Sequence, residues 1–295
     1  MKQHEEITIQ TLASKEEIQI GYSDNDIVVV NSVQQFAEIS SAHVAMNVIT
    51  ICTRGKVQAQ MNGETITLNE NQLAIIPENV NITDLMVTPD FNLKALFVTS
   101  RALQSFLREK MYLWNDMMYI HRLHLITLDE ESMTFYTHFY DMLCLIIDKG
   151  KGNPFQSDII QSLIRSAVLA LCGAMKQLQP TSQSEEETVS GNVHFQRFLE
   201  LLHNSQVRYR PVEAYADQLC ISPKYLTSIC KKHSGKTANE WIRQQVLEDI
   251  RYYLKQTDLS IKQICDQLGF PNPSFFGKYV KTHFGMTPMQ FRMKG

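Results

Sequence analysis

Basic side chains recur in two segments near the carboxyl terminus, residues 211–233 and 260–283, at spacings that could bind a polyanion. In both segments the lysines alternate with apolar residues at helical spacing, so they should stand on the outer face of a helix. Ammonium groups on such a face can contact phosphates, and neighbouring polar side chains can reach base edges. The predicted chemistry is nucleic-acid binding. The lysines concerned are Lys224, Lys231, Lys232, Lys278 and Lys281.

Short helices must position these side chains. In the second segment Ser260 and Gln263 form a helix-start signature, and Gly269 should end that helix. Asn272 can cap a second helix, whose first position suits Pro273. Two short helices joined by a tight turn make a helix-turn-helix, a shape that fits the major groove of DNA.

The same order of residues occurs once before, in 211–233, where Ser222 and Pro223 repeat the cap and first position. The two copies lie about 50 residues apart and form an internal repeat. Between them, Thr237 and Glu240 form a capping box that should begin a long connecting helix. The sequence therefore predicts an all-α domain with two helix-turn-helix motifs.

The repeat resembles the DNA-binding domain of AraC-type transcription regulators. The resemblance rests on Ile221–Gly235, on Gly269-Phe270, on the FF-x-K-Y-V-K run and on the carboxyl-terminal G-M-T-P-x-Q-F-R. It implies a non-enzymatic, sequence-specific regulator of transcription whose partner is double-stranded DNA. It also allows contact with RNA polymerase, and it leaves activation and repression equally open. A module that acts through protein contacts alone is the alternative.

By position in the family motif, particular side chains receive roles. The expected base contacts are Lys224, Thr227, Ser228, Ser274, Gly277 and Lys278. The expected phosphate contacts are Lys231, Lys232, Arg251 and Lys281. Residues expected to hold the helices in place are Tyr225, Leu226, Ile229, Phe276, Tyr279 and Val280.

Charge is distributed unevenly along the 295 residues. Residues 205–295 carry 14 Lys and Arg against 7 Asp and Glu, whereas residues 1–204 carry 14 against 24. A basic terminal domain on an acidic body suits nucleic-acid binding at one end only. A solvated charged surface would not by itself place the excess on the repeated motif.

Short β-rich runs separated by turn residues extend from residue 20 to residue 100. Asn62-Gly63 between two such runs is a strong hairpin signal, and regular short strands predict a closed or double-sheet β fold. Residues 53–77 resemble the jelly-roll, cupin-like effector domain of AraC-type regulators. The predicted fold class is therefore α+β, with a regulatory β domain and its helical segment in residues 1–178.

The resemblance also suggests an effector site. Arg54 stands at the position that resembles the sugar-binding arginine of arabinose-type effector domains. The alternative is that Arg54 is an exposed hairpin residue without a binding role. Leu93 and Ala95 stand where a sugar site would show His and Trp, and Asn81 replaces another frequent His. We therefore expect an apolar or amphipathic effector, with Arg54 meeting an acidic group.

Cofactor and metal sites are not expected. Metal-dependent cupin enzymes need a His and Glu cluster, and residues 44–77 lack one. His121 and His124 could share a helix face, but a packing role is the simpler interpretation. The six cysteines form no CxxC pair, so they should be reduced core residues. With no membrane-length apolar run or leader, a cytoplasmic protein without membrane contact is expected.

A seam of apolar and small residues marks the last helix before a polar stretch. It consists of Ile160, Ile164, Ala167, Leu171, Ala174 and Leu178. Spacing alone leaves a dimer seam and a core-facing stripe open. The family places an antiparallel dimer contact here, so a homodimer through this seam is expected. Residues 179–193 form the expected linker, and residues 194–295 the DNA-binding domain.

Overall fold

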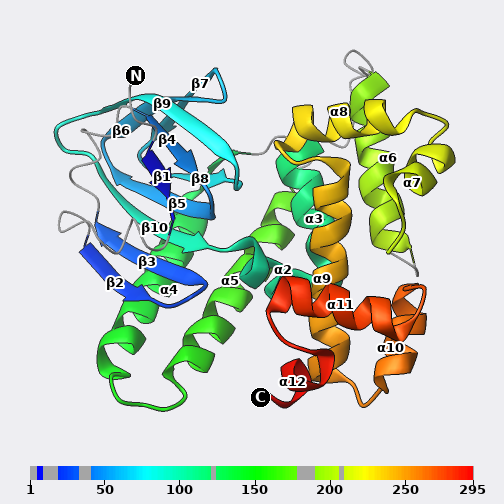
Figure 1. Ribbon diagram of the computed structural model, residues 1–295. Helices are drawn as coiled ribbons and strands as arrows, with labels where there is room; N and C mark the ends of the chain where they lie inside the picture. The colour runs from blue at the N-terminus through cyan, green and yellow to red at the C-terminus, as the bar shows by residue number, and fades with distance from the viewer. Residues whose placement is uncertain are drawn as a thin grey trace. The chain divides into compact units, whose positions relative to one another are not determined.

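The computed structural model of the chain describes residues 5–8, 19–32, 41–120, 124–177, 190–205 and 209–294 (Figure 1). The chain divides into two compact units, Met1–Pro180 and Thr181–Gly295. The first unit contains the strands together with several helices, and the described part of the second is helical. This is the α+β architecture predicted from the sequence, and the division falls inside the predicted linker.

The first unit is built on two sheets whose apolar faces enclose a common core. One sheet has the order β1 (Glu5–Ile7), β4 (Ser41–Val44), β9 (Val80–Val87), β6 (Lys56–Met61) and β7 (Glu64–Asn69). The other has the order β11 (Leu125–Thr127), β8 (Gln72–Ile76), β5 (Asn47–Arg54), β10 (Asn92–Val98), β3 (Ile27–Ser32) and β2 (Gln19–Ser23). Strands β1 and β4 pair in parallel, and the other described pairs are antiparallel.

The predicted hairpin at Asn62-Gly63 joins β6 to β7, with Met61 opposite Glu64. Asn62 and Gly63 have φ angles of 51° and 88°. Positive φ at both central residues is the requirement of the two-residue hairpin turn that matches strand twist. Local sequence therefore determines the register of this pair.

Some features of the sheets are not evident from the local sequence pattern. The apolar run from residue 44 to residue 52 is divided between the two sheets, because β4 ends at Val44 and β5 begins at Asn47 in the other sheet. Strand β9 was not predicted, because polar residues such as Asn81 and Asp84 interrupt its apolar pattern. Asp84 has a φ of 52°, and the pairing of β9 with β6 shifts register nearby, which is typical of a β-bulge.

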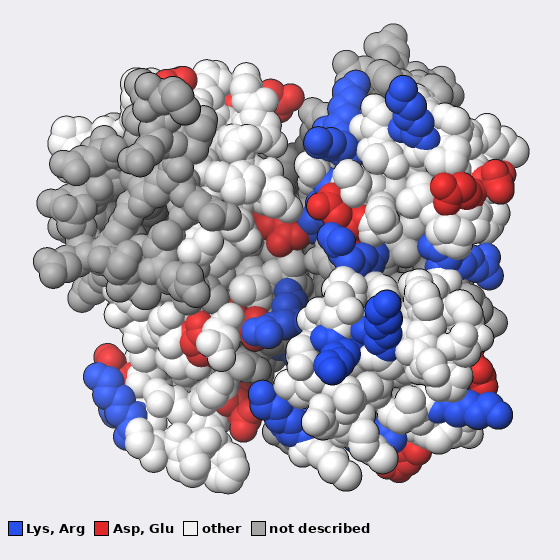
Figure 2. Space-filling view, in the orientation of Figure 1, with Lys and Arg blue, Asp and Glu red and all other residues white. Residues whose placement is uncertain are grey.

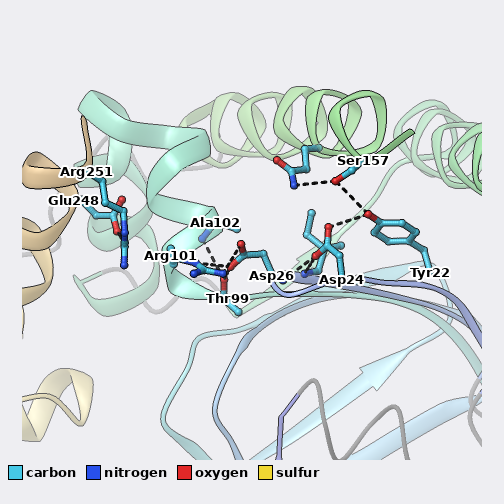
Figure 3. A network of polar contacts seen from close by, with 11 residues as sticks. Tyr22, Asp24, Asp26, Thr99, Arg101, Ala102, Ser157, Glu248 and Arg251 are labelled. Carbon is cyan, nitrogen blue, oxygen red and sulfur yellow. Dashed lines mark hydrogen bonds and ion pairs between the residues drawn. The ribbon is translucent and has the colours of Figure 1, made fainter. Parts of the chain in front are cut away.

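Helices follow the strands in the first unit: α2 (Ser100–Leu107), η2 (Arg108–Lys110), α3 (Met111–Asn115), η3 (Asp116–Ile120), α4 (Glu130–Lys149) and α5 (Gln156–Gln177). Figure 3 shows how α2 is attached to the sheet that precedes it. Thr99 caps the helix and donates its hydroxyl to Asp26 Oδ1 at 2.5 Å, and Arg101 donates to both oxygens of Asp26 at 2.8 and 2.7 Å. These charge-assisted bonds join the start of α2 to the β2–β3 turn.

The predicted dimer seam on α5 belongs instead to the core of the single chain. Ile160, Ile164 and Leu171 are at most 2% exposed, because α5 packs against α2, α3 and α4. Ala167 and Ala174 are half-buried, and Leu178 lies outside the described residues. Within the described part, α5 is the helix long and apolar enough to cross a membrane by length and composition.

The second unit contains α6 (Ser190–Asn204), α7 (Val212–Gln218), α8 (Pro223–Ser234), α9 (Ala238–Gln256), α10 (Ile261–Leu268), α11 (Pro273–Phe284) and α12 (Pro288–Met293). The predicted capping boxes at Thr237 and Ser260 are both formed. Helix α6 begins at Ser190 rather than at 194, so the predicted linker 179–193 is too long at its carboxyl end.

Leu171→Asp should unfold the first unit rather than separate a dimer, because it places a carboxylate in the core. We expect a loss of more than about 4 kcal/mol of unfolding free energy, seen as loss of cooperative thermal unfolding by circular dichroism. Ala170→Asp, on the exposed side of the same helix, is the matched control and should keep the transition. A Leu171→Asp protein that is folded but monomeric would instead support the interpretation of this stripe as a dimer contact.

Candidate nucleic-acid interface and interior cavity

Helix α9 is the element on which both helix-turn-helix motifs are built. Helices α7 and α8 of the first motif pack on it, as do α10 of the second motif and the terminal helix α12. Its buried residues are Ala238, Trp241, Ile242, Val246, Ile250 and Leu254, each at most 4% exposed. Complete burial of one such large side chain stabilises a fold by about 1.5–3 kcal/mol. The position of each motif in the unit therefore follows from this one apolar face.

The second helix of each motif, α8 and α11, starts and ends in the same way. Ser222 Oγ accepts from the Tyr225 amide at 3.2 Å, and Asn272 Oδ1 accepts from the Phe275 amide at 2.8 Å. Both helices have proline in the first turn and end at a glycine with a φ of 72°. The internal repeat predicted from the sequence is thus a repeat of local structure, and α8 and α11 are the two candidate recognition helices.

The predicted base-contacting and packing residues lie on opposite faces of these helices. Lys224, Ser228, Ser274 and Lys278 are exposed, and Thr227 and Gly277 are half-buried. Leu226, Ile229, Phe276 and Val280 are at most 4% exposed and hold the helices to the unit, as predicted. Each helix therefore leaves one polar face open to a partner.

Lysines beside these faces supply positive charge. Lys231, Lys232 and Lys281 are exposed near the carboxyl ends of α8 and α11. Figure 2 shows Lys and Arg side chains recurring over the surface of the second unit. Lys236 is different, since it is only 8% exposed and donates to Gln244 Oε1 at 2.9 Å. It belongs to the interior of the unit and adds little to the surface field.

Arg251 is less available for phosphate than the sequence suggested. Its guanidinium pairs with Glu248 (Figure 3). It also lies 5.0 Å from the centre of the Phe284 ring. These contacts commit the side chain to joining α9 and α11. A phosphate would have to compete with the Glu248 carboxylate for it.

Three further residues at this surface escaped the sequence prediction. Tyr225 and Phe275 are 40% and 45% exposed, although Tyr225 was expected to pack and Phe275 shares the apolar pattern of α11. They occupy the same place after the cap in the two helices. Arg243 is exposed on α9, close enough to α11 to act on His283 electrostatically. The sequence repeat could have predicted this aromatic pair, because Tyr225 and Phe275 occupy equivalent positions in the two motifs.

The positive charge of this surface at neutral pH comes from lysine and arginine rather than from histidine. Burial lowers the pKa of His283 below its ordinary value, and the nearby Arg243 lowers it further. The imidazole is therefore mainly neutral at pH 7. Burial also raises the pKa of Tyr279 to about 12, so its phenol keeps its proton. The histidine and tyrosine rings, 4.5 Å apart, pack together rather than carry charge.

A second candidate site is an interior cavity of about 130 Å³ between the two sheets of the first unit. Leu93 and Ala95 both line it, so the positions compared with a sugar site do face the interior. Arg54 is exposed at the end of β5 and does not belong to the lining. The arginine that was expected to meet an acidic group of the effector therefore does not line the cavity, because Arg54 is exposed at the β5–β6 turn.

The histidines of the first unit have ordinary polar partners. His43 Nδ1 lies 2.9 Å from Asn81 Oδ1, and His124 Nδ1 lies 3.3 Å from the Ile75 carbonyl oxygen. His121 lies outside the described residues. In the described ranges no group of three or more His, Cys, Asp or Glu side chains is arranged to hold a metal ion.

The second unit is similar to helix-turn-helix domains of known proteins. A family model for a helix-turn-helix domain matches residues 215–294. The Msm operon regulatory protein of Streptococcus mutans is 27% identical over 165 residues, which are 54% of this chain and 58% of that protein. The XylDLEGF operon transcriptional activator of Pseudomonas putida is 26% identical over 156 residues, 51% of this chain and 46% of that protein. The match spans about half the length of these relatives.

Among solved structures, unsaturated fatty acid bound ToxT from Vibrio cholerae aligns with 92% of this chain and 96% of its own. The sequence identity is 11% and the TM-score is 0.36.

Gly277 and Gly285 provide a matched pair that tests α11. A Cβ at either position meets no atom within 4 Å, but Gly277 has helical backbone whereas Gly285 has a φ of +72°. Gly277→Ala should stabilise the helix by about 0.5–1 kcal/mol, and Gly285→Ala should destabilise it by about 1 kcal/mol. Hydrogen exchange of the α11 amides measures both. Faster exchange in Gly277→Ala would contradict the described helix.

Proposed function

We propose that this chain, whose carboxyl-terminal unit is an AraC-type helix-turn-helix domain, is a sequence-specific DNA-binding regulator of transcription. The observation that carries the proposal is the pair of like recognition helices, α8 and α11, packed through α9 with a polar face left open on each. The family match and the curated regulators that resemble the chain support it.

Binding would divide between two kinds of contact. Lys231, Lys232 and Lys281 would meet phosphates and supply affinity that depends on salt. Lys224, Thr227 and Ser228 of α8, together with Ser274 and Lys278 of α11, would meet base edges and supply sequence choice. Two recognition helices in successive major grooves of one duplex face lie about 34 Å apart.

The two helices would not read DNA equally. Gly277 occupies the place of Thr227 in the second motif and has no side chain to offer a base. The exposed rings of Tyr225 and Phe275 could contact thymine methyl groups, which present an apolar surface in the major groove. We therefore expect α8 to contribute more hydrogen-bonded base contacts than α11.

Control by a small molecule in the first unit is part of the proposal, and the interior cavity supports it. A homodimer is also proposed, and its contact would lie outside the buried α5 stripe. The outer face of α4 offers Phe135, Met142 and Leu145, which are 53%, 42% and 52% exposed. RNA polymerase as a partner and a cytoplasmic location follow from the same proposed role, with no cofactor required.

Lys224→Ala and Lys232→Ala separate the two kinds of contact. Lys224→Ala should weaken binding to the preferred site by about 1–3 kcal/mol and relax one base position, because a base contact is lost. Lys232→Ala should weaken all sequences alike and reduce the salt slope by about one. Selection from random duplexes, followed by titration at several salt concentrations, measures both.

Lys262→Ala is the matched control for this experiment, since Lys262 is an exposed lysine on α10 outside the two recognition helices. It should leave the preferred sequence unchanged. Unaltered site preference in Lys224→Ala would show that the base-reading face of α8 is wrongly assigned. Binding that does not depend on salt would argue for a regulator that acts through protein contacts alone.

A further inference from the structure

Small residues from both sheets line the cavity of the first unit. Its lining includes an alanine from each of four strands: Ala42, Ala59, Ala74 and Ala95. Two come from the β1-β4-β9-β6-β7 sheet and two from the other. Protein interiors are normally packed without voids larger than a water molecule, so a space of about 130 Å³ is a departure from ordinary core packing.

The wall of the cavity consists almost entirely of apolar atoms. Thr50 and His124 are the polar side chains among the described lining residues, and both direct hydrogen bonds to the main chain. The Thr50 hydroxyl donates to the Lys94 carbonyl at 3.0 Å. His124 Nδ1 faces the Ile75 carbonyl at 3.3 Å and so carries a proton there. A ligand with many hydroxyl groups would lose its hydration without recovering equivalent hydrogen bonds.

Charge complementarity is also lacking. Among the described residues, the lining includes neither Lys nor Arg, and Arg54 stands exposed outside it. A buried carboxylate without a cationic or hydrogen-bonding partner is strongly disfavoured. An acidic effector would therefore bind this cavity much more weakly than a neutral molecule of the same shape.

We propose that the cavity binds a small, uncharged, apolar molecule and that this molecule is the effector, which rests on the regulator function proposed above. The volume sets the size class, because an apolar protein cavity of about 150 Å³ stays dry and binds benzene. A single aromatic ring or a short aliphatic chain fits, and binding follows from burial of apolar surface. The ligand regulates DNA binding by preferring one conformation of the protein.

Matched neutral and ionised probes test the chemistry in the full-length chain at pH 7.5. The pairs are toluene with benzoate and 1-hexanol with hexanoate, and D-xylose is the polyol probe. At 1 mM, toluene and hexanol should raise the melting midpoint of the first unit by about 3 °C or more. Benzoate, hexanoate and xylose should leave it unchanged. Equal stabilisation by an ionised partner, or no shift with any probe, would overturn the proposal.

Cavity-filling variants place the binding site. Ala95→Leu and Ala59→Leu add bulk from opposite sheets and should each abolish the shift produced by toluene. Ala170→Leu, on the exposed face of α5, is the control and should retain it. If one filling variant does not fold, the other decides. A shift that persists in a folded filling variant places the ligand elsewhere and overturns the cavity assignment.

Affinity for the selected DNA site, with and without toluene, distinguishes the two proposals. A change of at least about fivefold supports the effector role. If toluene shifts the melting midpoint but DNA affinity is unchanged, the effector role is overturned. The assignment of the cavity to small, neutral, apolar ligands would then still hold. A chain that binds neutral probes but shows no preference among DNA sequences contradicts the proposed function, and the ligand class stands.

Discussion

Burial of one face of α9 is the constraint on which the second unit depends. Helices α7, α8, α10 and α11 are each of 12 residues or fewer, a length at which isolated helices are marginal in water. They persist because their apolar faces meet one another and α9. Tyr209, which lies just before α7, adds a second connection. Its ring stacks on the ring of Phe270, with 4.0 Å between the two ring centroids. The open faces of both motifs are thereby held within one core.

The two units use apolar residues in opposite ways. In the second unit, side chains such as Val246 and Phe276 are fully buried and leave the polar faces outside. In the first unit, alanines from both sheets line a space between the sheets. Close packing suits a surface that must keep a fixed shape against a duplex, whereas an incompletely filled interior can gain stability from a ligand. This contrast supports a division between DNA binding and regulation.

The α5 helix shows why spacing is an incomplete guide to assembly. Ile160, Ile164 and Leu171 recur at the interval of a dimer seam, but α2 and α4 of the same chain already cover them. A helix that packs beside two neighbours needs the same apolar stripe as one that packs against a second chain. Any dimer must therefore use a surface that remains exposed, such as the outer face of α4.

The sequence alone determined the features that depend on neighbouring residues: the caps at Ser222 and Asn272, the capping boxes, the Asn62-Gly63 hairpin and the repeated motif. These follow from hydrogen bonds and backbone angles within a few residues. Only the tertiary structure decided which face of α5 is covered, that Arg54 lies outside the cavity, and that Arg251 is engaged by Glu248 and Phe284. The burial and pairing of those side chains depend on contacts between segments that are far apart in the chain. The local sequence pattern does not predict such contacts.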